Sequence, residues 1–466
     1  MSSLAELSAG EIATRVCGRD LTAREVIEAA LQRIDTGNPR LNCFSTTLRA
    51  RALCRADALD ARLAREPVSL PLAGVPFGVK NLFDIEGVTT ISGSKIHRER
   101  PPARADATLI RHMEDAGAIL LGAQHMDEYA YGFTTENAHY GPARNPHDLE
   151  RMTGGSSGGS AGAVAAGLVP LSLGSDTNGS IRVPAAFCGV YGLKPTYGRL
   201  SRGGSLGFAH SLDHMGVFAR SAHDLARAYD ALQGMDGGDP AQHPRPIEPC
   251  LPELRLGIDG VRCARLGGWF ERGLSNEVAG AVALVADALA ATATVTLKEA
   301  ERARAAAFCI TAAEAGNLHF HDLKSRAADF DPATRDRLLA GSLLPATIIQ
   351  QAQRFRRWFY EQTIAEFRQH DLLLAPATPV SALKIGSPTM MLGGQLVPAR
   401  ANIGLYTQPI SFIGLPVVTV PVHTPNRMPV GVQIIAPPWR EDLLMRAAAW
   451  LERSAVISAP IARGWS

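Results

Sequence analysis

The sequence predicts an α/β fold in which helices cover a central sheet. Stretches with helical periodicity alternate with short apolar stretches typical of buried strands along most of the 466 residues. Hydrophobic residues make up 46% of the chain, which is enough for a large buried core. No stretch is rich enough in Pro, Gly or Ser to divide the chain cleanly, so we expect one domain spanning residues 1–466.

The first part of this domain, residues 1–70, is expected to be helical. Capping-box spacing occurs at Ser8–Glu11 and again at Thr22–Glu25, and this spacing is typical of helix N-termini. Apolar side chains at positions 27, 30, 31 and 34 then share one helical face.

Strands and helices alternate through the rest of the chain. In the core part, residues 71–235, we expect strands at 72–79, 118–121 and 168–173, a helix at 108–116, and another after the capping box of Ser221 and Asp224. Residues 236–252 are the best candidate for a boundary before a mainly helical insertion, residues 253–370, with strands at 254–258 and 293–297 and helices at 276–289 and 347–369. The C-terminal part of the core, residues 371–466, has expected strands at 372–375, 416–422 and 430–435 and a closing helix at 441–453.

Charge and composition exclude several classes of protein. The chain has 47 basic and 45 acidic residues, whereas binding to nucleic-acid phosphates needs a concentrated basic surface. Residues 1–24 have no apolar core of the signal-peptide type, and no window approaches about 18 uninterrupted strongly apolar residues. The seven cysteines include no C-x-x-C pair, which favours reduced thiols. We therefore expect a cytoplasmic protein that binds neither nucleic acid directly nor a membrane.

Residues 154–160, with the sequence GGSSGGS, are the least ordinary stretch of the chain. A phosphate-binding loop would need Lys where Ser160 stands. A nucleophile elbow, G-x-S-x-G around Ser156, would need a buried strand before it, and residues 145–153 are too polar for one. A flexible linker is also disfavoured, because an Ala-rich helix and an apolar strand follow at once.

A second cluster of small residues lies at positions 174–182, directly after the strand predicted at 168–173. Small residues let backbone N–H groups approach a ligand closely and point inward, as in an oxyanion hole. Ser180 stands near the end of this cluster. Taken alone the cluster could be a structural turn, but its pairing with residues 154–160 favours a functional site.

Lys80 ends the apolar, glycine-containing stretch at residues 74–81. It either marks the solvent end of a strand or is a buried lysine whose lowered pKa lets it act as a neutral base. A serine is a weak nucleophile unless a neighbouring base takes its proton. No His, Cys or Asp pair stands in a comparable motif, so Lys80 is the natural base for a catalytic serine.

Lys80, residues 154–160 and residues 176–182 occur in the order found in the amidase signature family, and the chain resembles that family. The resemblance extends over roughly residues 60–450 and includes residues 181–189, 192–196, 414–416 and 429–433. It implies the family's fold, a mixed central β-sheet covered on both faces by α-helices. It also implies a hydrolase that acts on carbon–nitrogen bonds other than peptide bonds and needs no cofactor.

The resemblance further implies a Ser–cisSer–Lys triad. Ser180 matches the nucleophile, Ser156 matches the bridging serine that follows a cis peptide bond, and Lys80 matches the base. The backbone N–H groups that match the oxyanion hole are those of Thr177, Asn178, Gly179 and Ser180. Asn178 departs from the family pattern, which commonly has glycine there, and its side chain adds an amide near the substrate. A scaffold subunit that had lost activity would be expected to lack one of the three triad residues, and all three are present.

Two groups within the family are similar to this chain. Residues 126–132 and 208–213 resemble the A subunit of glutamyl-tRNA(Gln) amidotransferase, although Val183 stands where that protein has glutamine. Residues 176–180 look more like the 1-carboxybiuret hydrolases of cyanuric acid (s-triazine) breakdown. This second resemblance implies deamination of 1-carboxybiuret or a similar small carboxylated urea, a small helical partner similar to the amidotransferase C subunit, and a homodimer or heterotetramer. The alternatives are a general small-amide amidase and a glutamine amidotransferase A subunit.

A small anionic substrate needs a cation, and Arg337 aligns approximately with a substrate-carboxylate arginine of the amidotransferase. The alternative for Arg337 is a solvated helix face; a mostly buried side chain without a carboxylate partner would favour the substrate pocket. Tyr131 and Gln408 are further candidates for substrate binding. We expect no metal site, because His319 and His321 do not share a helical face and no other set of ligands is evident.

Overall fold

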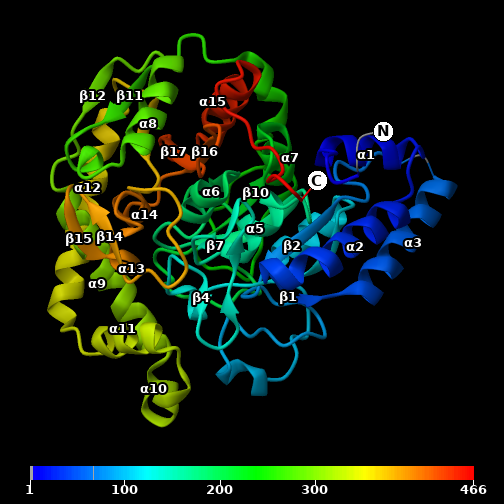
Figure 1. Ribbon diagram of the computed structural model, residues 1–466, viewed down its shortest axis with the longest axis horizontal. Coiled ribbons are helices and arrows are strands. Elements are labelled where there is room, and N and C mark those ends of the chain that lie inside the picture. The colour runs from blue at the N-terminus through cyan, green and yellow to red at the C-terminus, as the bar shows by residue number, and fades with distance from the viewer. Residues whose placement is uncertain (1–3, 67, 466) are drawn as a thin grey trace.

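The computed structural model describes residues 4–66 and 68–465 of the chain. Within that part, eleven strands form one mixed β-sheet, and helices cover both of its faces (Figure 1). The α/β fold predicted from the sequence is confirmed. Across the sheet the strands lie in the order β1 (Phe44–Thr47), β3 (Ile119–Gln124), β2 (Pro76–Lys80), β8 (Leu171–Asp176), β10 (His214–Ala219), β9 (Tyr191–Lys194), β16 (Val417–Val422), β17 (Val430–Ile435), β13 (Leu372–Pro376), β11 (Cys263–Leu266) and β12 (Ala293–Val295).

The ends of β2 and β8 form the part of the sheet that matters most for the candidate site. β2 is parallel to both of its neighbours, β3 and β8, and its register pairs Val79 with Leu173. Parallel neighbours end at the same edge of a sheet, so Lys80 at the end of β2 lies beside the residues that follow β8. From β8 across to β13 the neighbouring strands are antiparallel, whereas β11 is parallel to both β13 and β12.

Three helices form the N-terminal region: α1 (Ala9–Cys17), α2 (Ala23–Leu41) and α3 (Arg49–Arg65). Both predicted capping boxes are confirmed, because the hydroxyls of Ser8 and Thr22 accept hydrogen bonds from backbone N–H groups three residues further on. β1, which lies between α2 and α3 and pairs with β3, was not predicted from the sequence. A strand of 4 residues is too short to give a clear periodic signal.

The Gly/Ser stretch of the sequence leads into α5 (Gly158–Ala165), a completely buried helix and not a linker. A Cβ atom added at Gly159 would lie 2.5 Å from the carbonyl oxygen of Cys43. Glycine is needed there because neighbouring backbone occupies the place of a side chain. The other helices of the core are α4 (Thr108–Asp115), α6 (Arg182–Cys188), α7 (Ala222–Leu232), α14 (Gln408–Phe412) and α15 (Glu441–Arg453).

The insertion at residues 253–370 is mainly helical, and it also contributes β11 and β12 to one edge of the sheet. Its helices are α8 (Asn276–Ala288), α9 (Ala300–Leu318), α10 (Phe320–Arg326), α11 (Pro332–Ser342) and α12 (Ala346–Glu366). α9 and α11 approach so closely that a Cβ added at Gly341 would lie 1.9 Å from the carbonyl oxygen of Ala312. In Figure 1 these two helices and α10 lie together at the lower left, far from α1 to α3.

Short elements complete the described chain. They are the paired strands β4 (Glu136–Asn137) with β5 (Gly141–Pro142), β6 (Arg144–Asn145) with β7 (Asp148–Met152), and β14 (Thr389–Leu392) with β15 (Gln395–Pro398), together with helix α13 (Ala399–Asn402). The 3-10 helices are η1 (Ile96–Glu99), η2 (Glu128–Ala130), η3 (Leu251–Leu256), η4 (Gly268–Glu271) and η5 (Ala327–Asp329).

The strand predicted at residues 254–258 is wrong, because η3 occupies the first part of that stretch. Pro252 lies in the first turn of η3, where its missing N–H does no harm, and Gly257 ends it with φ 64°. Of the alternating apolar residues in η3, only Leu254 is buried. The strand predicted at 72–79 begins only at Pro76, and β9 and β10 were missed. The ends of the other predicted elements shift by a few residues.

All parts of the chain contribute to the one sheet, from β1 near the N-terminus to β17 near the C-terminus. This supports our proposal that residues 1–466 form a single domain with the parts predicted above. Residues 1–3, 67 and 466 lie outside the described residues. The linker predicted at 236–252 contains no helix or strand apart from the first residues of η3.

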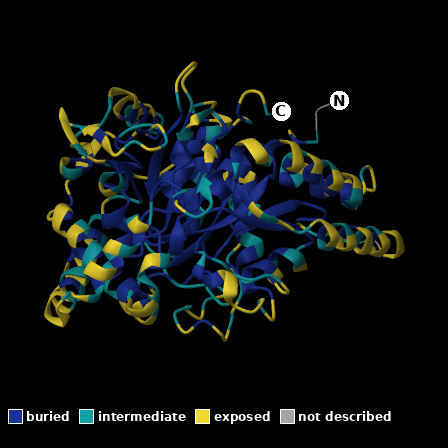
Figure 2. Cartoon of the chain, turned by 60° about the horizontal axis from the view of Figure 1, so that its bottom comes forward, coloured by how far each residue is buried: buried dark blue, intermediate teal, exposed yellow. Residues whose placement is uncertain are grey.

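Buried residues are concentrated in the sheet and in the helices packed directly against it, and exposed residues lie on the peripheral helices (Figure 2). Lys80, Ser156 and Ser180 all belong to the buried set. Among the helices of the described ranges, none is long and apolar enough to cross a membrane.

Replacing Gly341 with alanine tests the contact between α9 and α11. The added methyl group overlaps the carbonyl oxygen of Ala312, so we expect the free energy of unfolding to fall by about 1–3 kcal/mol. Gly280→Ala in α8 is the matched control, because nothing lies within 4 Å of its added Cβ. Urea denaturation compares the two variants, and equal stability would contradict the close approach of the helices.

Candidate active site

Lys80 ends β2, and its side chain is completely buried. Its Nζ donates hydrogen bonds to Ser156 Oγ at 2.6 Å and to Ser175 Oγ at 2.8 Å. Ser175 lies near the end of β8, the parallel neighbour of β2, so the sheet itself brings the amine and this hydroxyl together. Of the two interpretations of Lys80 that the sequence allowed, the structure has the buried lysine.

Burial removes water from the ammonium group and lowers the pKa of Lys80 to about 7. Three nearby carboxylates oppose this lowering, those of Asp127, Asp213 and Asp176. Near neutral pH a large share of Lys80 is therefore an uncharged amine, which can accept a proton.

Ser156 lies in the segment between β7 and α5, and the peptide bond that joins it to Gly155 is cis. The next residue, Ser157, donates a hydrogen bond from its backbone N–H to the carbonyl oxygen of Ser180 at 3.2 Å. The Ser156–Ser157 segment is thus bound to Lys80 on one side and to the turn that carries Ser180 on the other. The three predicted triad residues therefore lie in one buried cluster.

The turn that carries Ser180 is organised by a buried carboxylate. Asp176 accepts hydrogen bonds from the backbone N–H groups of Gly179 at 2.7 Å and Ile181 at 3.2 Å. Arg182 binds the same carboxylate through Nε and Nη2, both at 2.9 Å. Burial alone would raise the pKa of Asp176, but the charge and hydrogen bonds of Arg182, together with the charges of Lys194 and His214, hold the pKa well below its usual range. Asp176 therefore stays ionised and keeps the turn in one shape.

Three of the four backbone N–H groups predicted for an oxyanion hole have no acceptor within the part of the chain that the structure describes. They are those of Thr177, Asn178 and Ser180. Gly179 differs, because its N–H is already bonded to the carboxylate that organises the turn. Its φ is 139°, and an added Cβ would lie 2.2 Å from Thr407 Oγ1, so only glycine fits at this position.

Asn178 and Gln408 bring side-chain amides close to this turn. Asn178 Nδ2 donates to Thr311 Oγ1 on α9 at 2.9 Å, and Thr407 Oγ1 donates to the Asn178 carbonyl oxygen at 2.6 Å. Gln408, next to Thr407 on α14, accepts a hydrogen bond from Arg304 Nε at 2.9 Å. Asn178 Oδ1 and Gln408 Nε2 are buried and have no partner within the described residues. Buried polar atoms are seldom left unpaired, so these two favour a polar ligand.

Arg337 and Tyr131, far apart in the sequence, meet in the structure. The guanidinium of Arg337 lies over the Tyr131 ring, 4.0 Å from its centroid, and Nη2 donates to the Tyr131 carbonyl oxygen. Arg337 Nε donates to the carbonyl oxygen of Ala333 at 2.8 Å. The side chain is half-buried, burial lowers its pKa, and no carboxylate of the described chain forms an ion pair with it. The missing carboxylate favours the substrate pocket over a solvated helix face.

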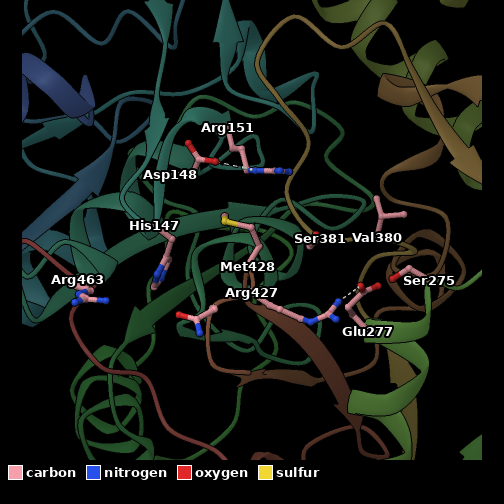
Figure 3. A pocket seen from close by; sticks show the side chains of 11 residues that line it. His147, Asp148, Arg151, Ser275, Glu277, Val380, Ser381, Arg427, Met428 and Arg463 are labelled. Carbon is pink, nitrogen blue, oxygen red and sulfur yellow. Dashed lines mark hydrogen bonds and ion pairs between the residues drawn. The ribbon is translucent and has the colours of Figure 1, made fainter.

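A pocket of about 960 Å³ opens elsewhere on the surface (Figure 3). Its lining includes none of the residues predicted for the site. Two of its arginines are already paired with carboxylates in the same lining, Arg151 with Asp148 and Arg427 with Glu277. Because none of the predicted site residues line this pocket, it is not the candidate active site.

Comparison with known proteins identifies the family. A protein-family model described as Amidase matches residues 25–445, most of the chain. The chain belongs to the amidase family. It is an amidase-signature hydrolase that acts on carbon–nitrogen bonds, as the resemblance in the sequence implied.

Relatives of this amidase match over nearly their whole length. AtzE of Pseudomonas sp. (strain ADP), named as a 1-carboxybiuret hydrolase subunit, is 52% identical over 448 residues, which cover 96% of this chain and 98% of the relative. The A subunit of the glutamyl-tRNA(Gln) amidotransferase of Acidothermus cellulolyticus is 36% identical, with 97% of this chain and 95% of the relative covered. A solved structure, described as a vestigial protein complex that reveals the origins of an s-triazine catabolic enzyme, has a TM-score of 0.96 and 51% identity, and covers 97% of this chain and 100% of its own.

Some residues of the amidase site were not named from the sequence. Ser175 is the second acceptor of Lys80, and the parallel pairing of β2 with β8 would have pointed to it. Asp176 stands in the cluster of small residues, but no sequence pattern indicates that its carboxylate accepts hydrogen bonds from the backbone of the turn. Thr407 lies in a distant part of the chain without a motif. No group of three or more His, Cys, Asp or Glu side chains that could hold a metal occurs among the described residues.

Removal of the Asp176 carboxylate should destabilise the whole amidase. In Asp176→Ala the guanidinium of Arg182 keeps its charge in a completely buried position, so we expect a loss of about 3–5 kcal/mol in the free energy of unfolding. Asp57→Ala removes a carboxylate that pairs with Arg24 at the surface, and it should cost at most about 1 kcal/mol. Chemical denaturation measures both variants, and similar losses would contradict the role given to the buried pair.

Proposed function

We propose that this amidase hydrolyses a linear amide C–N bond of a small carboxylated urea, 1-carboxybiuret or a close analogue, through an acyl-enzyme. The observation that carries the proposal is the 2.6 Å hydrogen bond from Lys80 Nζ to Ser156 Oγ, in a buried position beside the Ser180 turn. Acyl transfer by a serine needs a base and a nucleophile, and a hydroxyl between them can relay the proton. We assign Lys80 as the base, Ser180 as the nucleophile and Ser156 as the hydroxyl that relays the proton.

The proposed proton path starts from the uncharged amine of Lys80. The amine takes a proton from Ser156 Oγ while Ser156 takes one from Ser180 Oγ, and Ser180 attacks the amide carbonyl carbon. The path then runs backwards, so that the amide nitrogen gains a proton and leaves as ammonia. Water attacks the acyl-enzyme, loses its proton by the same path and frees Ser180.

The oxyanion is assigned to backbone N–H groups of the turn. Those of Thr177, Asn178 and Ser180 have no acceptor in the described chain, so they can bind the developing charge without breaking another hydrogen bond. Gly179 was also predicted as a donor. In our proposal it instead keeps the turn in shape through its bond to Asp176.

The carboxylate of the substrate is assigned to Arg337, which lies over the ring of Tyr131 and has no ion pair with a carboxylate of the described chain. The unpaired Gln408 Nε2 and Asn178 Oδ1 suit the carbonyl and N–H groups of a urea. The 52% identity to a protein of 1-carboxybiuret hydrolysis supports this substrate class.

We further propose a small helical partner, similar to the amidotransferase C subunit, in a heterotetramer, with a homodimer as the alternative assembly, and a cytoplasmic location. The 52% identical relative is named as one subunit of its enzyme, and the similar solved structure is described as a protein complex. Size-exclusion chromatography with light scattering of the chain alone would give its own oligomeric state.

A glutamine amidotransferase A subunit is the second candidate. It is favoured by the 36% identity to such a protein over 485 residues. Glutamine hydrolysis that rises when amidotransferase partner subunits are added would establish it. Turnover of a simple aryl amide would instead indicate a general small-amide amidase.

The pH profile should report the ionisation of Lys80. Because the base must be uncharged, a pKa of about 7 predicts that kcat/KM rises as the pH increases through about 7 and levels off above it. Lys80→Arg stays charged at these pH values and should lose at least about 10³-fold in kcat/KM. Initial rates of ammonia release give the profile, and a fall in rate through pH 7 would contradict a neutral amine base.

Ammonia release also tests reaction and substrate together. The panel is 1-carboxybiuret generated in place, biuret, allophanate, glutamine and an aryl amide, and Ser180→Ala should lose at least about 10³-fold in rate because the nucleophile is gone. Ser160→Ala is the matched control; its hydroxyl, on α5, donates to the carbonyl oxygen of Leu173, and activity should stay near that of the parent chain. Full activity in Ser180→Ala would overturn the acyl-enzyme, and turnover of glutamine but not of 1-carboxybiuret would overturn the substrate.

A further inference from the structure

We propose that Glu128 is a positioning residue for substrate recognition: it fixes the start of α11 so that Arg337 stays over Tyr131. The inference rests on the proposed function, because it takes Arg337 and Tyr131 as the part of the site that binds the substrate carboxylate. It concerns a residue that does not itself contact the reacting groups.

Glu128 and Asp331 form the centre of this arrangement. The side chain of Glu128 is completely buried, and its Oε2 accepts a hydrogen bond from the backbone N–H of Asp331 at 2.7 Å. Asp331 is the N-cap of α11, and its carboxylate accepts hydrogen bonds from Ala333 N and from Ala138 N, both at 2.9 Å. Two segments, residues 128–138 and the start of α11, are therefore bonded to each other in both directions.

The residues next to this pair also pack together. Tyr129 follows Glu128, Phe330 precedes Asp331, and their ring centroids are 5.7 Å apart. The Tyr129 ring also lies against His319 at the end of α9, with the centroids 3.9 Å apart. Glu128 and Tyr129 thus contact Asp331 and Phe330 on the opposite segment.

The backbone after Glu128 has an unusual shape that serves the same contact. Tyr129 and Ala130 have φ 52° and 60°, in the left-handed region that residues other than glycine seldom adopt. After this turn the carbonyl oxygen of Tyr131 accepts the hydrogen bond from Arg337 Nη2. Such a conformation persists only where the surroundings hold it, and the Glu128 contact lies directly before it.

The charges of this cluster allow the two carboxyl groups to lie close together. Burial raises the pKa of Glu128 to about 7, although the hydrogen bond from the Asp331 N–H and, to a smaller extent, the charge of Lys95 act in the opposite direction. His139 Nε2 lies 3.0 Å from Glu128 Oε1, and burial lowers the pKa of that imidazole. Whether ionised or protonated, Glu128 offers a carboxyl oxygen to the N–H of Asp331. Glutamine, which offers a carbonyl oxygen instead, should therefore replace it.

The geometry gives a specific expectation for Arg337. It lies within about two helical turns of Asp331 on the same helix, so a shift at the start of α11 moves the guanidinium relative to Tyr131. The serine, lysine and oxyanion groups lie on β2, on the segment before α5 and on the β8 turn, and among the described residues no hydrogen bond or ion pair joins these groups to α11. Loss of the Glu128 contact should thus raise KM for a carboxylated substrate and leave kcat almost unchanged.

The test compares Glu128→Asp, which keeps the carboxylate but shortens its reach, with Glu128→Gln, which keeps the reach but removes the charge. With 1-carboxybiuret generated in place, Glu128→Asp should raise KM about tenfold with kcat within about twofold, and Glu128→Gln should stay within about twofold in both. In the background of Arg337→Ala, Glu128→Asp should have no further effect, because the residue acts through Arg337. Asp224→Ala is the control; that buried carboxylate joins α7 to α1 through two backbone N–H groups and should not change KM.

Amide hydrogen exchange gives a second measurement that does not depend on which amide is cleaved. Exchange in the first turn of α11 should speed up in Glu128→Asp and stay as in the parent chain in Glu128→Gln. Unchanged exchange in Glu128→Asp, or an impaired Glu128→Gln beside a normal Glu128→Asp, would overturn the positioning role. Failure of the proposed function would give a different result. The parent chain would not turn over 1-carboxybiuret, or Arg337→Ala would not change KM.

Discussion

The guanidinium of Arg182 is completely buried, and the groups that it binds come from distant parts of the chain. Besides the carboxylate of Asp176, it donates to the carbonyl oxygen of Thr407 at 3.0 Å and to Gln433 Oε1 at 2.7 Å. Thr407 in turn binds the backbone of Asn178, and Gln433 lies in β17. The shape of the Ser180 turn thus depends on β8, on β17 and on the start of α14 at once. A buried ion pair gives little net stability, because desolvation of the two charges offsets their attraction, but removal of one partner leaves the other charge buried and uncompensated.

Burial acts in opposite directions on the pKa values of the two charged groups at the centre of the site. It favours the uncharged form of both groups. Asp176 stays ionised because Arg182 pairs with it, whereas Lys80, whose hydrogen-bond acceptors are neutral hydroxyls, can give up its proton. Exposure of this edge of the sheet to water would move the pKa of Lys80 back towards its ordinary value and leave the amine charged at neutral pH.

Local patterns explain what the sequence could predict. Helical periodicity, capping boxes and short apolar runs depend on residues close together in the chain, so most of the longer helices and seven of the eleven strands of the large sheet were predicted, while α9, α11 and the order of strands across the sheet were not. The Lys80 and Ser180 motifs could be recognised for the same reason, since each lies within one short run of residues. Thr407 and Glu128 could not, because their importance arises only when distant segments meet. The strand expected at residues 254–258 failed because alternating leucines also occur in a 3-10 helix that buries a single one of them.

The close approach of α9 and α11 at Gly341 has a consequence for how the substrate preference of enzymes with this fold can change. The serine that would break the bond lies on the turn after a strand of the sheet, whereas the arginine that would choose the substrate belongs to a helix of the insertion. A small slide of that helix along its neighbour would present a different group to the substrate's far end and leave the proton path intact. New preferences can thus evolve by re-seating one helix, without rebuilding the sheet that does the chemistry.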